Sequence, residues 1–114
     1  MNKLIEKALR QKVERLEMFE ERFRIRIENI SIRIDDSQGV KVFCEVFPTN
    51  GSKIEQDLNI EFILYDKEGS ILEKTEEYID SEDFYGFEVL EAYFWTENGI
   101  ADEIGKIRIY PKKG

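Results

Sequence analysis

The chain has 114 residues, of which 41% are apolar and 37% are charged, with one Cys, two Pro, seven Gly and no His. This length and composition are typical of one globular domain, and a single Cys cannot form an internal disulfide. The absence of His excludes His-based zinc sites, HExxH motifs and Ser-His-Asp triads. The sequence therefore predicts a domain that needs neither disulfide nor metal to fold, and we expect no cofactor.

Charge is unevenly distributed along the chain. Residues 1–34 contain nine basic and six acidic side chains, whereas residues 35–114 contain eight and nineteen, a net charge of −11. Such an acidic region repels the phosphate backbone of nucleic acids. The basic side chains of the N-terminal region are equally typical of the solvated face of an amphipathic helix. We therefore expect no nucleic-acid partner.

The first residues contain no recognisable targeting signal. Charged side chains interrupt the apolar ones from Lys3 onward, so no apolar run is long enough for the core of a signal peptide or for a membrane span. A free thiol is typical of a reducing compartment. These features predict a cytoplasmic protein without a membrane partner.

Between residues 2 and 21, apolar side chains recur at intervals of three and four. This period predicts one continuous amphipathic helix, which forms an N-terminal unit of residues 1–22. Leu9 and Leu16 are also seven residues apart, with Phe19 in the complementary heptad position. These three side chains are therefore candidates for self-association as a possible homodimer. The alternative is that the apolar stripe folds back onto the sheet of the same chain.

After Phe23 the pattern changes to strict alternation, which is the period of a β-strand. Residues 24–27 and residues 30–34 alternate with opposite parity. One uninterrupted strand would place their Ile side chains on opposite faces of the sheet. We therefore expect a bulge or a break at residues 28–29, followed by a turn at residues 35–39.

Three further strands follow from the same alternation. A strand over residues 40–46 carries Cys44 in its apolar phase, so we interpret this thiol as a buried hydrophobic group and not as a reactive thiolate. Residues 58–65 form the next strand, and the turn Asp66-Lys67-Glu68-Gly69 predicts a hairpin. The returning strand is highly charged over residues 73–78, which is typical of a sheet edge that discourages pairing with other chains.

The stretch Phe62-Ile63-Leu64-Tyr65-Asp66, followed by Gly69, resembles the F-x-L-Y-D signature of the FxLYD domain family. The resemblance covers about a third of the chain. It implies an immunoglobulin-like β-sandwich of the kind found in prokaryotes, and a bacterial origin. It assigns no functional role to any residue of this chain. We expect the chain to depart from the usual context of the family, because the residues given contain no lipoprotein signal and predict an additional helix.

Residues 84–95 contain six of the aromatic side chains of the chain, and both phases of the strand predicted from Phe87 onward are largely apolar. One interpretation is a central strand that the second sheet covers on one side and the N-terminal helix on the other. The other is an exposed aromatic patch that binds a partner. The candidate contact residues in this segment are Tyr85, Phe87, Tyr93 and Trp95.

The acidic stretch Asp80-Ser81-Glu82-Asp83 is a candidate cation site by its composition alone. It lacks the spacing of an EF-hand loop and the closing Glu at position twelve of that loop. We therefore interpret it as a solvated loop or helix cap, and we expect no metal ligands in the chain.

Together these patterns predict a mainly β fold in which one N-terminal helix leads into an antiparallel, immunoglobulin-like β-sandwich of six or seven strands over residues 23–114. The function we expect is that of a non-catalytic protein-interaction module, which binds a protein partner or itself through the helix or the aromatic sheet face. The alternative is a carbohydrate-binding domain or a carboxylate-based hydrolase. It rests on Glu88, Glu91 and Glu97, which lie beside Tyr93 and Trp95.

Overall fold

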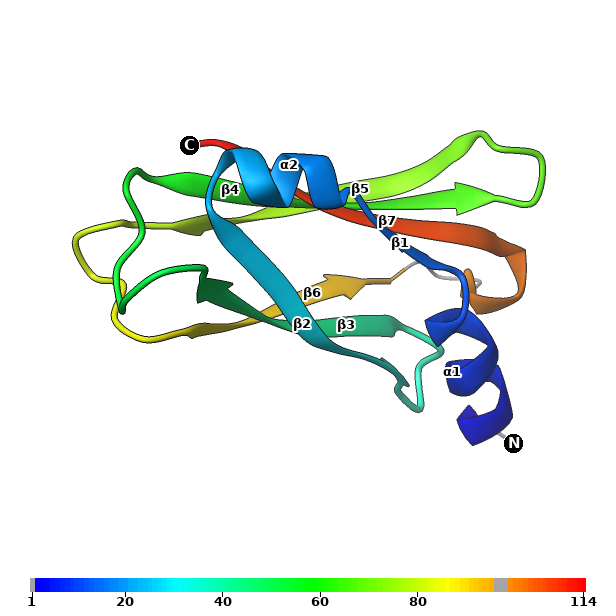
Figure 1. The fold of residues 1–114 in the computed structure, drawn as a ribbon. Helices are drawn as coiled ribbons and strands as arrows, with labels where there is room; N and C mark the ends of the chain where they lie inside the picture. Colours follow the sequence, from blue (N-terminus) through cyan, green and yellow to red (C-terminus); the bar gives the residue numbers. More distant parts are fainter. Residues whose placement is uncertain (1, 96–98) are drawn as a thin grey trace.

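The computed structural model describes residues 2–95 and 99–114. In this part of the chain two β-sheets pack as two layers, with strand orders β1-β7-β4-β5 and β2-β3-β6 (Figure 1). The strands are β1 (Val13–Arg15), β2 (Ile25–Ile34), β3 (Val40–Pro48), β4 (Leu58–Asp66), β5 (Ile71–Ile79), β6 (Glu88–Phe94) and β7 (Ile104–Lys113). The predicted mainly β class, with seven strands in two sheets, is confirmed.

The predicted continuous helix over residues 2–21 is wrong in its middle. The structure has helix α1 (Asn2–Arg10), strand β1 and a second helix, α2 (Glu17–Arg22). β1 pairs in parallel with β7, and the backbone N–H of Ile107 donates to the carbonyl of Lys12 at 3.1 Å. The edge of β7 thus offers backbone hydrogen bonds that only an extended segment can accept, which explains the interruption of the helix. It also makes one pairing of the sandwich parallel.

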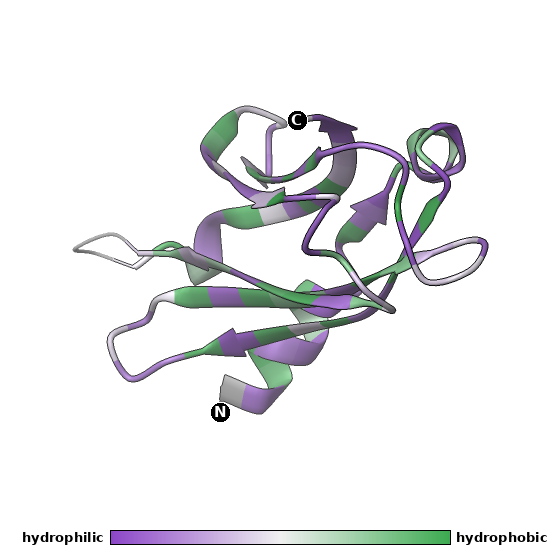
Figure 2. Ribbon diagram, turned by 90° about the vertical axis from the view of Figure 1, so that its left-hand side faces the viewer, coloured by the Kyte–Doolittle hydropathy of each residue, from purple (hydrophilic) through white to green (hydrophobic). Residues whose placement is uncertain are grey.

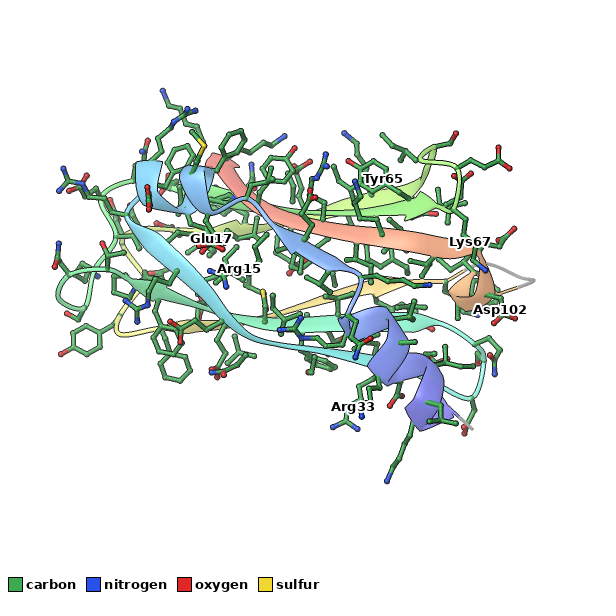
Figure 3. The ribbon with its side chains drawn as sticks, turned by 45° about the vertical axis from the view of Figure 1, so that its right-hand side comes forward. Arg15, Glu17, Arg33, Tyr65, Lys67 and Asp102 are labelled. Carbon is green, nitrogen blue, oxygen red and sulfur yellow. The ribbon has the colours of Figure 1, made fainter. Side chains whose placement is uncertain are left out.

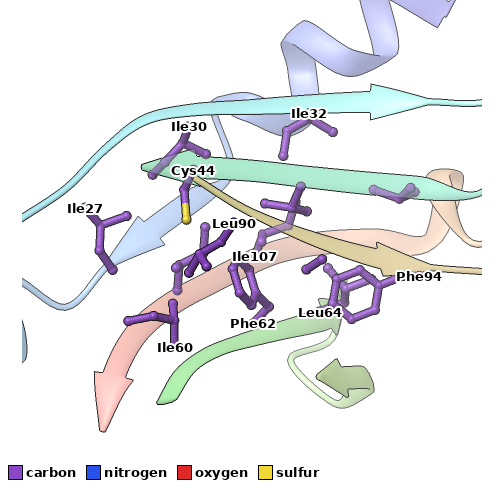
Figure 4. Close-up of a cluster of buried hydrophobic side chains, with 14 of the residues drawn as sticks. Ile27, Ile30, Ile32, Cys44, Ile60, Phe62, Leu64, Leu90, Phe94 and Ile107 are labelled. Carbon is purple, nitrogen blue, oxygen red and sulfur yellow. The ribbon is translucent and has the colours of Figure 1, made fainter. Parts of the chain in front are cut away.

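Alternating side chains of both sheets fill the space between the layers (Figure 4). On β3, for example, the even-numbered residues from Val40 to Val46 are buried and the odd-numbered ones point outward. Hydrophilic and hydrophobic positions accordingly alternate along the strands (Figure 2). Cys44 is fully buried in this core, as predicted.

The predicted bulge and hairpin are both present. The register between β2 and β3 shifts between Glu28 and Ser31, and Asn29 adopts a φ of 53°. In the β4–β5 turn, the carboxylate of Asp66 accepts hydrogen bonds from the N–H groups of Glu68 and Ser70, each at 2.9 Å. Gly69 supplies the positive φ of 93° that this turn requires.

The strand order corrects one expectation for the aromatic segment. β6 lies at an edge of the three-stranded sheet and not at its centre. Neither helix covers its outward face, since Val89 and Tyr93 remain 58% and 44% exposed. The charged β5 is an edge strand, as predicted.

Candidate interaction surface

The outward side of β3 and β6 carries a row of apolar side chains that nothing in the described chain covers. We call it the aromatic face, and it consists of Phe43, Phe47, Phe87, Val89, Tyr93 and Trp95. The described residues include nine exposed large hydrophobic side chains in all, and five of these lie within residues 85–95. The exposed apolar surface of the protein is therefore concentrated on one strand and its flanks.

At one end of the aromatic face two rings stack across neighbouring strands. The ring centroids of Phe47 and Phe87 are 5.3 Å apart with an interplanar angle of 14°. The guanidinium of Arg26, on β2, lies 5.5 Å from the centre of the Phe47 ring. These contacts hold the rings in place without removing them from solvent, so this end presents a preformed, flat surface.

At the other end Tyr93 lies across the β2–β3 turn. Its hydroxyl donates to the Asp35 carboxylate at 2.7 Å, and Lys41 lies 5.8 Å from its ring centre. A Cβ at Gly39 would come within 2.3 Å of the Tyr93 hydroxyl oxygen, so only glycine leaves room for the ring. The hydrogen bond from Tyr93, and a second from the N–H of Gly39, hold the pKa of Asp35 below its ordinary value. The same bond to Asp35 raises the pKa of Tyr93.

A shallow depression of ≈ 570 Å³ lies between these two ends. It is lined by Asn29, Ser31, Arg33, Phe43, Glu45 and Val89, together with Cys44, which is itself fully buried. Arg33 points away from the core beneath the three-stranded sheet, whereas Tyr65 projects from the opposite layer (Figure 3). Glu45, whose carboxylate accepts a hydrogen bond from the side-chain amide of Asn29, is the one acid among these lining residues. The depression therefore lacks the pair of facing carboxylates that a glycosidase needs.

Side chains from the N-terminal segment close the far edge of the same sheet. The backbone N–H of Ile34 donates to the Glu6 carboxylate at 2.8 Å, and the carbonyl of Ile30 accepts from Nε of Arg10 at 2.8 Å. On α2, Glu20 accepts a hydrogen bond from the N–H of Ile27 at 3.1 Å. Three backbone groups along the outer edge of β2 are therefore satisfied by side chains of the chain itself.

Glu20 is itself anchored by a bidentate pair with Arg15. The two guanidinium-to-carboxylate distances are 3.0 and 2.8 Å, and Glu20 is only 3% exposed. This hydrogen bonding raises the pKa of Arg15. The pair connects β1, α2 and β2, so it fixes the N-terminal segment against the sandwich.

The edge of β6 has no comparable closure. Within residues 2–95 and 99–114, no side chain hydrogen-bonds to a backbone group of β6. In an antiparallel sheet, every second residue of an edge strand directs its N–H and carbonyl toward the open side. β6 therefore combines an unpaired backbone edge with the exposed apolar side chains of the aromatic face.

The structure separates the seven predicted contact residues into two groups. Leu9 is 1% exposed and belongs to the core, so it is not available to a partner. Leu16 is half-buried at the start of α2, and the half-buried Phe19 packs edge-on against Tyr110 at 5.6 Å. Because the helix ends at Arg10, the continuous heptad seam that self-association of the helix requires is absent.

The aromatic candidates lie in exposed positions. Tyr85 is 77% exposed, Phe87 47% and Trp95 48%, and Tyr93 shares the outward side of β6. One expectation falls on a residue outside the described ranges, namely the place of Glu97 in the hydrolase hypothesis.

A second polar cluster, on the outward side of the four-stranded sheet, could not be found from the sequence. Glu61 is 3% exposed, and the Nζ of Lys112 lies 3.4 Å from the carboxylates of both Glu61 and Glu76. Burial and the neighbouring Glu76 carboxyl raise the pKa of Glu61. Lys112 contacts both carboxylates, so one cation serves two acidic side chains and compensates only part of their charge.

The polar groups of the loop at residues 80–83 form hydrogen bonds within the chain. The carboxylate of Asp80 accepts from the N–H of Glu82 at 2.9 Å, and Ser81 donates to Asp57 through its N–H and its hydroxyl. Among the described residues no three acidic or thiol side chains are grouped as metal ligands.

No helix of this part of the chain has the length and apolar character needed to span a bilayer.

Comparison with known proteins yields a likeness of fold only. No family model and no curated protein matches this sequence, so the resemblance to the FxLYD family is not confirmed. The chain is similar to a crystal structure of a DUF1425 family member from Shewanella sp. pv-4, with a TM-score of 0.52 and 9% identity over 79% of this chain and 78% of that one. It is also similar to the crystal structure of Campylobacter jejuni cj0090, with a TM-score of 0.49 and 13% identity over 89% of this chain and 98% of that one. The fold thus resembles that of a small bacterial β-rich domain, and neither neighbour indicates a catalytic family.

Proposed function

We propose that this domain is a non-catalytic protein-interaction module that binds its partner through the aromatic face. One observation carries the proposal: of the nine large hydrophobic side chains that are exposed in the described part of the chain, five lie within residues 85–95. A soluble domain seldom leaves such a concentrated apolar surface without a use, and exposed Tyr and Trp side chains are typical anchors of protein interfaces.

Two further features support this proposal. The rings of Phe47 and Phe87 are already stacked, and Tyr93 is already fixed by Asp35, so a partner would order few side chains on binding. A cytoplasmic location belongs to the same proposal and is supported by the buried, free thiol of Cys44.

A random peptide library displayed on phage tests the proposal. Peptides selected on the wild-type domain are measured against a Val89→Glu variant and against a control variant, Ile71→Glu. Ile71 is a matched control because it is 59% exposed, compared with 58% for Val89, and lies on β5. We expect the selected peptides to lose binding to the Val89 variant and to keep it for the control. Peptides that bind both variants as well as the wild type would overturn the proposal.

A further inference from the structure

We infer that β6 binds an extended, basic segment of a partner protein, which is added to the three-stranded sheet as a new strand. This inference rests on the proposed function and specifies the class of its ligand. It follows from a comparison of the four sheet edges and from the charge around one of them.

Three of the four edges are closed or protected. Side chains of Glu6, Arg10 and Glu20 bond to three backbone groups along the edge of β2. β1 spans only three residues. β5 carries Glu73, Lys74 and Glu76 among its exposed residues, and charged edge strands discourage pairing.

β6 is the remaining edge and has the features of a strand-binding site. It is seven residues long, and its outward side chains Val89 and Tyr93 are exposed apolar groups on either side of Glu91. In strand addition, backbone hydrogen bonds supply affinity and alternate side chains supply specificity. An added strand would place every second side chain beside this outward row.

The charge of this region selects the partner. Residues 71–95 contain eight acidic side chains and one Lys, so they carry a net charge of −7 in a chain whose total is −8. A second copy of the chain paired at β6 would bring two such segments together, and like charges oppose that contact. A segment with Lys or Arg at alternate positions complements the charge and places a cation opposite Glu91.

The surroundings of Glu91 support a cationic ligand. Glu77, on the neighbouring edge strand β5, has its pKa raised by burial and by the charge of Glu91. The charge of Glu91 therefore opposes ionisation of Glu77, and a basic side chain beside Glu91 would relieve this repulsion.

A synthetic peptide of alternating Lys and Val, labelled for fluorescence anisotropy, is the direct probe. We expect it to bind the wild-type domain, to bind less tightly at 1 M salt, and to outcompete both a Glu/Val peptide and a Lys/Val peptide of the same composition in two blocks. Glu91→Lys should weaken its binding about tenfold. Glu68→Lys, an equal change of charge in the exposed β4–β5 turn, should leave binding within about twofold of the wild type.

Amide hydrogen exchange with the Lys/Val peptide bound distinguishes strand addition from side-chain docking. We expect new protection at alternate amides of β6, which are the groups that face the open edge. Binding without this protection, equal binding of the Glu/Val peptide, or a doubled sedimentation mass that Val89→Glu abolishes would each overturn the inference. If library peptides still depend on Val89 in that case, the proposed function stands and only strand addition fails.

Discussion

The two edges of the three-stranded sheet, β2 and β6, differ in whether side chains bond to their backbone groups. At β2, two short helices supply Glu6, Arg10 and Glu20 to three backbone groups, whereas no side chain of the described residues bonds to the backbone of β6. A sheet edge is a hazard when it is exposed, and this chain uses its N-terminal segment to remove one such hazard. The two edges of one sheet therefore differ in how many of their backbone groups the described chain itself satisfies.

This comparison also accounts for the positive charge of the N-terminal region. Arg10 binds the carbonyl of Ile30, and Arg15 binds Glu20, so these cations serve the packing of the chain on itself. Arg26 likewise contacts Glu28 at 2.6 Å. A basic segment can therefore be structural, and its charge alone is no indication of nucleic-acid binding.

The largest effect is expected from breaking the closure of β2 at Glu20. Glu20→Ala leaves the Arg15 guanidinium and the Ile27 N–H without their acceptor in a buried position. We expect the free energy of unfolding to fall by about 3 kcal/mol in urea denaturation. Glu20→Gln keeps one acceptor oxygen, so its free energy of unfolding should fall by less than that of the Ala variant. A loss below about 1 kcal/mol for the Ala variant would show that α2 is held mainly by apolar packing.

A smaller effect is expected where the same edge is closed by α1. Glu6→Ala removes the acceptor of the Ile34 N–H, and we expect a loss of about 1 kcal/mol in urea denaturation. Lys7→Ala is the control, because Lys7 is exposed on the same helix. Equal losses in the two variants would mean that removal of any charged side chain from α1 has this effect, and that closure of the edge is not its cause.

At β6, substitutions should leave stability almost unchanged. Val89→Thr keeps a β-branched side chain and removes apolar surface that the fold leaves 58% exposed. We expect the free energy of unfolding to stay within about 0.5 kcal/mol of the wild type. A loss as large as that of Glu6→Ala would contradict the view that the outward side of β6 is kept for a partner.

The smallest effect concerns the hydrogen bond that fixes Tyr93. Because the pKa of folded Asp35 lies below its ordinary value of 3.8, the contact stabilises the fold above that pH and is lost as the pH falls through the lowered pKa. Tyr93→Phe should therefore be less stable than the wild type at pH 7, and the difference should vanish under strongly acidic conditions. Tyr85→Phe, at a 77% exposed position, serves as the control in denaturation at both pH values. A pH-independent difference would exclude Asp35 as its cause.

Much of the fold follows from local patterns in the sequence. The change of parity around Glu28 predicts the bulge in β2, and the sequence from Asp66 to Gly69 predicts the β4–β5 hairpin. The interruption of the N-terminal helix does not follow, because β1 pairs with a strand about ninety residues further along the chain. A helical period cannot report a hydrogen-bonding partner so distant in sequence.

The candidate site was predictable only in part. The exposed rings of Phe87 and Trp95 were among the candidates because aromatic residues cluster in this segment. That β6 lies at an edge depends on strand order, which no local pattern contains. Equally, nothing distinguishes Glu20 and Glu61 from the other acidic residues until the structure shows them buried.

The buried position of Cys44 makes its thiol a natural probe for separation of the two β-sheets. Its sulfur lies between the two layers, and burial raises the pKa of the thiol to about 12 (Figure 4). A thiol reagent can therefore modify it only after the layers have separated. The rate of modification of the native chain measures that separation directly, with no engineered probe.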